Sequence, residues 1–241
     1  MKTRAGNRRF DIVVFDADDT LWRSEDYFIV AEEVFRQRVQ PYAGSNVDVL
    51  DVLHRVEIGN VPISGYGIKP YALSMVQAAV EATDGAVPSR VIAGLVDYAH
   101  DMLNHPVDLL PGVTEVIQAL ATTHRLAVIT KGDLLHQMRK VRASGLMGHF
   151  QRVRVVEEKN VETYRSVFDE WSIDPAAIVM VGNSLKSDVL PIMELGGHGV
   201  HVPYHVTWGH EVVHEHDGTH TELANISELP AWLGAASEFA E

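Results

Sequence analysis

The sequence predicts an α/β fold, with a parallel sheet that has helices on both faces and an inserted all-helical cap. Two observations carry this prediction. From about residue 107 to 203, short apolar runs alternate with longer helical patterns, as in proteins built on a parallel sheet. Between residues 23 and 106 only helical patterns occur. We therefore expect a Rossmann-like core at residues 1–22 and 107–241, and a helical cap at residues 23–106.

The expected elements begin with a strand at residues 12–15, a run of four apolar residues. Ser24 then fits the N-cap of a first helix, because Glu25 and Asp26 follow it in the first turn, and this helix should end before Pro41. Breaks at residues 59–67 and at Asp84-Gly85 separate three further helices from one another. These helices are expected at residues 46–58, 70–83 and 88–104, and the later strands at residues 126–129, 153–156 and 178–181.

Three carboxylates and a hydroxyl follow the first strand directly: Asp16, Asp18, Asp19 and Thr20. Carboxylates this close repel one another unless a cation lies among them, and a divalent cation suits them best. Because alternate side chains of an extended chain point the same way, Asp16 and Asp18 can share one reacting centre while Asp19 points away. Alternatively, these acids belong to a polar loop that caps the next helix.

Polar groups also follow each later strand in turn. They are Thr130-Lys131-Gly132, then Lys159, then the segment from Asn183 to Asp188. Together with the first acids, and in this order, they resemble the four signature motifs of the haloacid dehalogenase-like (HAD) hydrolases. The resemblance covers nearly the whole chain. The helical insertion after the first motif is similar to the cap of subfamily I, so the resemblance implies the core and cap expected above.

The resemblance implies a role for each acid. Asp16 would be the nucleophile that attacks phosphorus and becomes a transient aspartyl phosphate, and Asp18 would protonate the leaving oxygen and later take a proton from water. Asp16, the main-chain carbonyl of Asp18, Asn183 and Asp188 would bind Mg²⁺. Many family members have aspartate in place of Asn183, whose neutral carbonyl implies weaker metal affinity or, alternatively, a lost activity. Asp188 would bind the metal through water or orient Lys159.

The same resemblance assigns phosphate binding to the second and third motifs. Thr130 would offer its hydroxyl to a phosphoryl oxygen, with the amide of Lys131 or Gly132 alongside, and Lys159 would neutralise the phosphoryl group. Alternatively, Thr130 is an ordinary β-branched strand residue, and Lys159 belongs to a solvated polar turn.

Substrate selection is expected in the cap, at Gly65-Tyr66-Gly67-Ile68-Lys69-Pro70. Glycines permit a sharp loop there, while Tyr66 offers an aromatic face and Lys69 a cation. Alternatively, this segment is a simple turn between helices with a solvated lysine.

Asp18 separates the reactions of the family. Haloalkanoic acid dehalogenases lack an acid two residues after the nucleophile, because a halide leaves without protonation. We therefore expect a magnesium-dependent phosphomonoester hydrolase that acts on a small phosphorylated metabolite. The alternatives are a phosphomutase of the same fold and a non-catalytic regulatory protein that binds metal or phosphate.

Seven of the thirteen histidines lie between His198 and His220, and such a tract raises the question of a transition-metal site. The spacings are irregular and cysteine is absent. The pairs His210 with His214 and His216 with His220 could each share a helical face, although Gly218 interrupts the second pair. We interpret the tract as surface and loop histidines with incidental zinc or nickel binding.

Composition excludes several classes of function. The chain is 46% hydrophobic and 22% charged, with a formal net charge of −13, which disfavours nucleic-acid polymers as partners. No apolar run approaches the roughly 20 residues of a membrane span, and the polar N-terminus does not resemble a signal peptide. We expect a cytoplasmic monomer or homodimer with no disulfide bond, because the chain has no cysteine.

Overall fold

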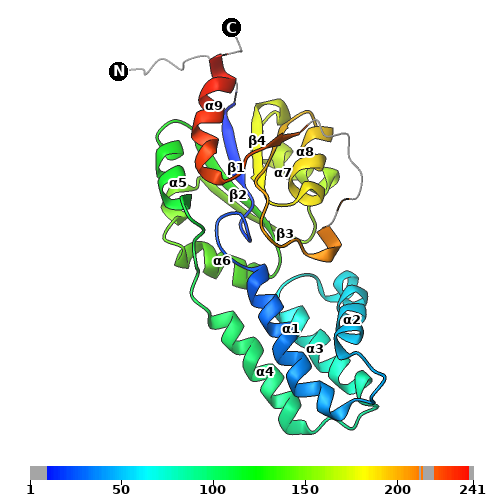
Figure 1. Cartoon of the computed structure of the whole chain (residues 1–241). Helices are drawn as coiled ribbons and strands as arrows, with labels where there is room; N and C mark the ends of the chain where they lie inside the picture. The colour runs from blue at the N-terminus through cyan, green and yellow to red at the C-terminus, as the bar shows by residue number, and fades with distance from the viewer. Residues whose placement is uncertain (1–9, 212, 214–219, 239–241) are drawn as a thin grey trace. The chain divides into compact units, whose positions relative to one another are not determined.

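The computed structural model describes residues 10–211, 213 and 220–238, and the chain divides into two compact units (Figure 1). The sheet-containing unit comprises Met1–Glu25, Val107–Thr130 and Arg139–Glu241, and the helical unit comprises Asp26–Pro106 and Lys131–Met138. The division differs from the expected boundaries mainly in residues 131–138, which group with the helices. The ion pair between Lys69 and Asp133 is one of the contacts that tie this segment to them.

The sheet has six parallel strands in the order β3-β2-β1-β4-β5-β6, so the predicted fold class is confirmed. The chain builds outward from β1 in one direction through β2 and β3, and in the other through β4, β5 and β6. The strand order therefore reverses between β1 and β4, and ligands of parallel α/β sheets bind at the carboxyl edge of such a reversal. The strands are β1 (Ile12–Phe15), β2 (Arg125–Lys131), β3 (Arg152–Val156), β4 (Ile178–Gly182), β5 (His198–His201) and β6 (Thr221–Glu222).

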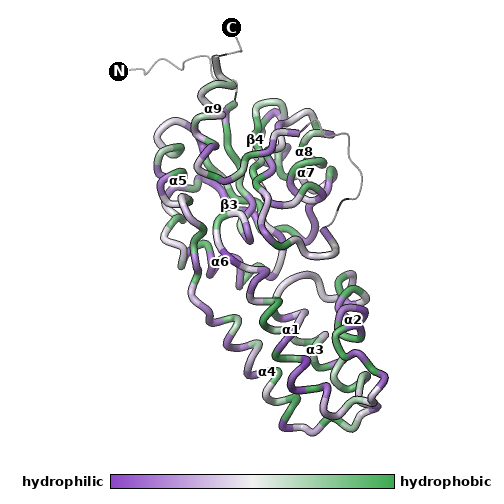
Figure 2. Tube along the Cα trace, in the orientation of Figure 1, coloured by the Kyte–Doolittle hydropathy of each residue, from purple (hydrophilic) through white to green (hydrophobic). Residues whose placement is uncertain are grey.

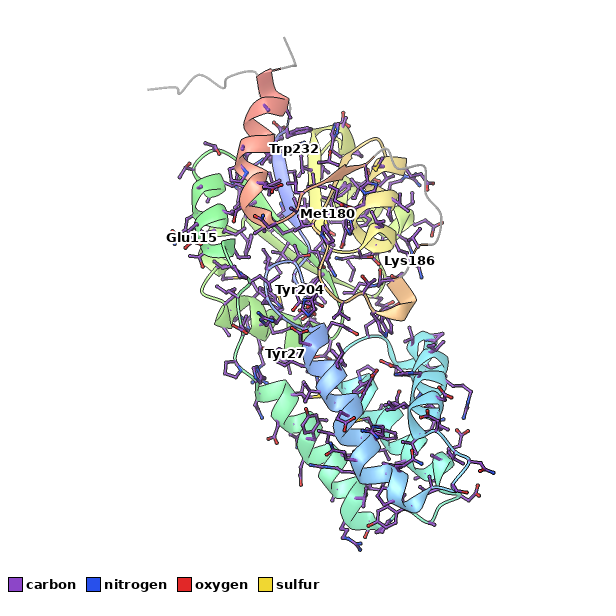
Figure 3. All side chains as sticks on the ribbon, in the orientation of Figure 1. Tyr27, Glu115, Met180, Lys186, Tyr204 and Trp232 are labelled. Atoms are coloured by element: carbon purple, nitrogen blue, oxygen red, sulfur yellow. The ribbon has the colours of Figure 1, made fainter. Side chains whose placement is uncertain are left out.

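Helices cover both faces of the sheet, and strand β1 shows why. All four residues of β1 are buried, with Val13 and Phe15 in one hydrophobic cluster and Ile12 and Val14 in another. Alternate side chains of a strand point to opposite faces, so an uninterrupted apolar run requires cover on both. Helices α5 and α9 pack together on the first cluster, and α7 and α8 on the second, which also buries Met180 (Figures 1 and 3).

The helices of this unit are short, and several are single turns. They are α5 (Val113–Ala121), α6 (Leu134–Ala143, which begins in the helical unit), α7 (Val161–Trp171), α8 (Leu190–Glu194) and α9 (Leu229–Glu238), with η2 (Met147–His149), η3 (Pro175–Ala177), η4 (Leu185–Val189), η5 (Gly209–Glu211) and η6 (Ile226–Glu228).

The helical unit is built from four helices around one apolar cluster. Hydrophobic and hydrophilic residues alternate along them, as expected for helices that bury one side (Figure 2). They are α1 (Glu25–Val39), α2 (Val49–Ser64), α3 (Ile68–Ala82) and α4 (Ser89–Asn104), with the short helix η1 (Gln40–Tyr42) after α1.

One predicted break in this unit is wrong. Helix α2 continues through Gly59 and Pro62 to Ser64, whereas the sequence led us to end it at residue 58. Glycine weakens a helix by only about 1 kcal/mol. Pro62 removes one backbone hydrogen bond, but it lies in the last turn, so the rest of the helix is unaffected. The turn itself is made by Gly65 and Gly67, which have positive φ values of 75° and 109°.

The two ends of the helical insertion meet within the sheet-containing unit. Arg23 N–H donates to the carbonyl oxygen of Asp108 over 3.0 Å, and Trp22 forms an antiparallel bridge with Leu109. In the described part of the chain, no helix is long and apolar enough to cross a membrane.

Candidate functional site

The loop after β1 brings Asp16 to the point where the strand order reverses. Asp16 is buried, and its N–H donates to the carbonyl oxygen of Val181 on β4 over 2.9 Å. Thr20 Oγ1 lies 3.2 Å from both Asp16 Oδ2 and Asn183 Oδ1, and accepts a hydrogen bond from Asn183 N–H over 3.1 Å. Thr20 therefore joins the loops that follow β1 and β4.

Lys159 lies between two buried acids. Its Nζ forms a short ion pair with Asp16 Oδ1, and lies 2.7 Å from Asp188 Oδ1. Its side chain is only 2% exposed, so the alternative of a solvated polar turn is wrong. Burial acts to lower the pKa of Lys159, but the charges of Asp16 and Asp188 outweigh it and hold the pKa well above its usual value. Lys159 is therefore a fixed positive charge.

For Asp16, in contrast to Lys159, burial has the larger effect on the pKa. Loss of water raises the pKa of Asp16 to about 7, although the ammonium group of Lys159 acts against this increase. A further positive charge at Asp16 would favour its ionised form, which is the form that can attack an electrophile.

Asp188, the second buried acid beside Lys159, has a hydrogen-bond partner at each carboxylate oxygen. Its Oδ2 accepts from the N–H of Ser184 over 3.0 Å while Oδ1 faces Lys159. The strand end beside it must be glycine, because a Cβ on Gly182 would lie 2.2 Å from Asp188 Oδ2. The ion pair with Lys159 fits the orienting role considered for Asp188.

Asp18 has its own cation, which sequence reasoning missed. Lys140 Nζ lies 2.5 Å from Asp18 Oδ1 and 2.7 Å from Oδ2, and Trp22 Nε1 donates to Oδ1 over 2.6 Å. Lys140 belongs to α6 and its side chain is 15% exposed. A lysine in the last turn of a helix is an ordinary stabilising residue, so nothing in the sequence distinguishes it.

Asp19 caps helix α1, which is the structural role considered for it. Its carboxylate accepts from the N–H groups of Ser24 over 2.8 Å and of Glu25 over 3.1 Å. Burial, and after it the charge of Asp18, raises the pKa of Asp19 to about 7, against the effect of these two hydrogen bonds. The first turn of α1 is thus fixed by the loop that carries Asp16 and Asp18.

Thr130 lies at the end of β2 and is buried, with 1% of its surface exposed. The parallel pairing of Phe15 with Val128 places Thr130 at the same carboxyl edge as Asp16. A second residue that the sequence did not reveal is the acid Glu211, which accepts from Ser187 Oγ over 2.6 Å and forms a short hydrogen bond with Ser184 Oγ.

The remaining predicted site residues belong to the helical unit. Lys131 Nζ lies 4.5 Å from the ring centroid of Tyr66, and Lys69 Nζ lies 2.9 Å from Asp133 Oδ1. Gly132 has a φ of 126°, a conformation that favours glycine. The structure therefore pairs Tyr66 and Lys69 with residues of the segment 131–138. Their role in substrate selection stays a prediction.

The oxygen donors near Asp16 suit Mg²⁺. A carboxylate, the amide oxygen of Asn183 and a main-chain carbonyl are hard ligands of the kind Mg²⁺ takes, and Thr20 keeps Asp16 and Asn183 close. Both carboxylate oxygens of Asp188 accept hydrogen bonds, from Lys159 and from the N–H of Ser184. Both carboxylate oxygens of Asp18 accept from Lys140. Asp16, Asn183 and the main-chain carbonyl of Asp18 are therefore the groups that would bind Mg²⁺.

The histidine tract agrees only in part with its interpretation as surface and loop residues. His205 is exposed and lies outside the strands. His201, however, lies in β5, and its side chain is only 12% exposed. His214 and His216 lie outside the described residues, so neither predicted helical pair is described in full.

Comparison with known proteins agrees with this geometry. The family model of haloacid dehalogenase-like hydrolase matches residues 10–196. A haloacid dehalogenase-like family hydrolase from Xanthomonas campestris is 37% identical, with a TM-score of 0.86 over 98% of this chain and 95% of that one. No curated protein matches the chain.

Two more distant structures share the fold. A 2-haloacid dehalogenase from Pseudomonas syringae is 21% identical, with a TM-score of 0.65 over 94% of this chain and 99% of that one. A predicted phosphoglycolate phosphatase from Haemophilus somnus is 15% identical, with a TM-score of 0.62 over the same shares of the two chains. The family model and the 37% identity over nearly the full length place this chain in the haloacid dehalogenase-like hydrolase family.

Proposed function

We propose that this hydrolase cleaves phosphomonoesters of a small metabolite through an aspartyl phosphate on Asp16. The observation that carries the proposal is Asp18, an acid two residues after the nucleophile that is held in place by Lys140 and Trp22. Departure of an alkoxide needs a proton, whereas departure of a halide does not. A held acid at this position therefore favours phosphate esters over haloacids.

In the first step, a carboxylate oxygen of Asp16 attacks phosphorus and the ester oxygen leaves with a proton from Asp18. Lys159 neutralises charge on the phosphoryl group, and the hydroxyl of Thr130 donates to one of its oxygens. In the second step, Asp18 takes a proton from the water that attacks phosphorus and regenerates Asp16. Lys140 and Trp22 both donate to the carboxylate of Asp18, an arrangement that suits the proton acceptor of the second step, and the ion pair with Lys140 must open before Asp18 can carry the proton of the first step.

Mg²⁺, held by Asp16, Asn183 and the carbonyl of Asp18, would offset the negative charges of Asp16 and the phosphoryl group. We expect chelation of divalent ions to abolish phosphate release and added Mg²⁺ to restore it. Because Asn183 is neutral, an Asn183→Asp variant should reach half of its maximal rate at a lower Mg²⁺ concentration than the wild type. An unchanged or higher Mg²⁺ requirement in that variant would argue against Asn183 as a ligand.

The deciding experiment measures two products side by side. Wild type and Asp16→Asn are given a panel of phosphomonoesters with Mg²⁺, and a panel of 2-haloalkanoic acids without it, and phosphate and halide release are followed. We expect phosphate release that Asp16→Asn abolishes. Halide release alone would identify a dehalogenase, and transfer of phosphate within a sugar phosphate would identify a phosphomutase.

Lys140 gives a second test of the same mechanism. Lys140→Met should lower kcat by about 10- to 100-fold, a part of the contribution of acid–base catalysis, with a smaller change in KM. Lys140→Arg keeps the cation and should recover most of the rate, and Arg142→Met on the same helix is the matched control. Full activity in Lys140→Met would show that Asp18 does not depend on this pair.

A further inference from the structure

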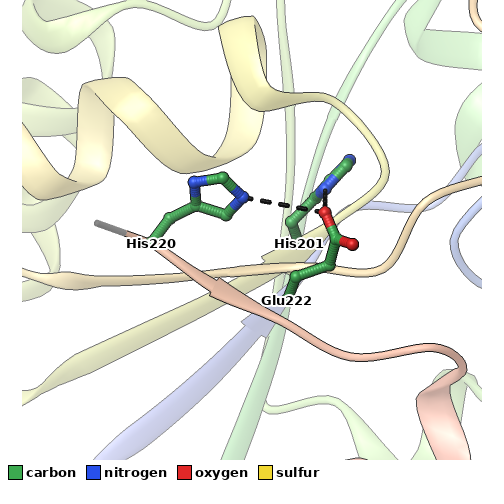
Figure 4. A group of neighbouring side chains, drawn as sticks. All are labelled: His201, His220 and Glu222. Atoms are coloured by element: carbon green, nitrogen blue, oxygen red, sulfur yellow. Dashed lines mark hydrogen bonds and ion pairs between the residues drawn. The ribbon is translucent and has the colours of Figure 1, made fainter. Parts of the chain in front are cut away.

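A second group of potential ligands lies beside the candidate active site, at the ends of β5 and β6 (Figure 4). The parallel pairing of these strands sets His201 opposite Glu222. His220 is two residues before Glu222, so the two side chains project to the same side of a locally extended chain. The sheet register therefore brings together three residues that are separated by up to 21 positions.

The ligand atoms lie close enough together for small shifts to give the spacing of a tetrahedral metal site. Glu222 Oε2 lies 3.0 Å from His201 Nδ1 and 3.8 Å from His220 Nε2, and all three ligand atoms lie within 4.8 Å of one another. Ligands about 2.0–2.1 Å from a tetrahedral zinc ion lie about 3.3 Å apart. In the described part of the chain, no other three His, Cys, Asp or Glu residues converge to this degree.

The second ring nitrogen of His201 supports the same conclusion. Its Nε2 lies 3.1 Å from the carbonyl oxygen of Asn183, which can only accept a hydrogen bond. Nε2 therefore carries a proton, and Nδ1 holds either a second proton, shared with Glu222, or a metal ion. Histidine ligands of metals commonly donate their other N–H to a main-chain carbonyl in this way. The fold thus fixes Nε2 as the donor and leaves Nδ1 to a metal that displaces the shared proton.

Charge and exposure indicate the class of metal. Glu222 contributes one carboxylate charge to the group. Two imidazoles and one carboxylate suit Zn²⁺ and similar transition metals, whereas Mg²⁺ prefers oxygen ligands. The side chains of His201 and His220 are 12% and 7% exposed, but Glu222 is 59% exposed, which leaves one side for a water ligand.

We propose that His201, His220 and Glu222 bind one transition-metal ion of the zinc class, separate from the Mg²⁺ proposed at Asp16, with its fourth position open to water. The ion would replace the proton that His201 and Glu222 share without it. Because Asn183 holds His201 through its main-chain carbonyl and faces Thr20 through its side chain, the ion would also fix the loop after β4.

The test is a Zn²⁺ titration of the full chain in competition with a chromophoric chelator, in excess Mg²⁺. We expect one tight equivalent in the wild type. Glu222→Gln and His220→Gln should each weaken it by about 100-fold or more, because even outer-shell changes cost 10- to 100-fold. His205→Gln, in the same tract but outside the group, is the matched control. Circular dichroism checks that each variant is folded, and exposed Glu222 carries little risk to folding.

Co²⁺ supplies an independent measurement. The wild type should give the intense visible bands of tetrahedral Co²⁺ with nitrogen and oxygen ligands, and Glu222→Gln should lose them. Equal Zn²⁺ affinity in the wild type, Glu222→Gln and His220→Gln would overturn the proposal, as would loss of the tight equivalent in His205→Gln alone. Neither measurement depends on phosphate release. A failure of the metal-site proposal can therefore be distinguished from a failure of the proposed activity.

Discussion

Among the described residues, the sheet-containing unit buries four charged side chains, whereas the helical unit buries only neutral polar ones. The four are Asp16, Asp19, Lys159 and Asp188, and the neutral group is Ser74, Thr83 and Gln137. Exposed large apolar side chains show the reverse distribution, since nine of the ten belong to the helical unit and Ile63 is the most exposed, at 85%. Buried charge costs stability and is kept where chemistry needs it. The difference supports the proposal that the reaction takes place in the sheet-containing unit.

Removal of Lys159 should produce the greatest loss. Lys159→Met leaves Asp16 and Asp188 buried without their cation, which should lower the free energy of unfolding by about 3–5 kcal/mol and abolish activity. Urea unfolding near neutral pH measures the change. The exposed lysine of the same unit, Lys186, is the control, and Lys186→Met should change stability by less than about 0.5 kcal/mol. Equal effects of the two would mean that the buried pair adds nothing.

A methyl group at Gly182 should have the next largest effect. The new Cβ would meet the carboxylate of Asp188 at 2.2 Å, so Gly182→Ala should cost about 1–3 kcal/mol as the loop after β4 shifts. Activity should fall with it, because Asp188 holds Lys159. Thermal unfolding and phosphate release measure the two effects. A stable and fully active Gly182→Ala would show that Asp188 can move without consequence.

Half-buried Glu57 makes the stability of the helical unit depend on pH. Burial raises its pKa to about 7, and the charge of His54 only partly opposes this. A carboxyl group whose pKa is raised by folding does not lower the free energy of unfolding at a pH below its ordinary pKa. As the pH rises from that value toward 7, the group lowers the free energy of unfolding by a growing amount. Glu57→Gln should therefore match the wild type at about pH 4.5, and be more stable by about 1–2 kcal/mol at about pH 8. A constant difference across this range would contradict the assignment.

Gly59 offers the smallest effect and one of opposite sign. It lies within α2, and a Cβ there would meet nothing within 4 Å. Gly59→Ala should raise the free energy of unfolding by about 0.4–1 kcal/mol, measured by the same urea series. Together with Gly182→Ala, this variant compares a glycine packed against a buried carboxylate with a glycine that has open space beside it. A destabilised Gly59→Ala would remove that contrast.

The sequence predicts β1, β2 and β4 well because they contain apolar runs that are buried on two faces, whereas β5 and β6 contain no such run and were not predicted. The sequence also predicts that four site residues lie at one edge of the sheet, because each is at or just past the end of its own strand. They are Asp16, Thr130, Lys159 and Asn183. The end of α2 was missed because a glycine and a late proline resemble a break but cost too little to cause one.

Other parts of the site depend on packing that no local pattern reports. Lys140 reaches Asp18 from a helix more than a hundred residues later, and its own surroundings in the sequence are ordinary. The pairing of His201 with Glu222 depends on strand register. The spacing of the histidines along the sequence therefore gives no sign that a glutamate joins them. Contacts of this kind require the three-dimensional structure.

The hydrogen bond between Arg23 and Asp108 also has an evolutionary consequence. Because the insertion leaves and re-enters the sheet-containing unit at paired positions, the intervening segment can be lengthened, shortened or exchanged with little change in the entropy of closing the chain. Gene segments that encode different caps could therefore be spliced at this junction while the catalytic residues keep their places. A lineage could acquire new substrates by recombination there, without first rebuilding its chemistry.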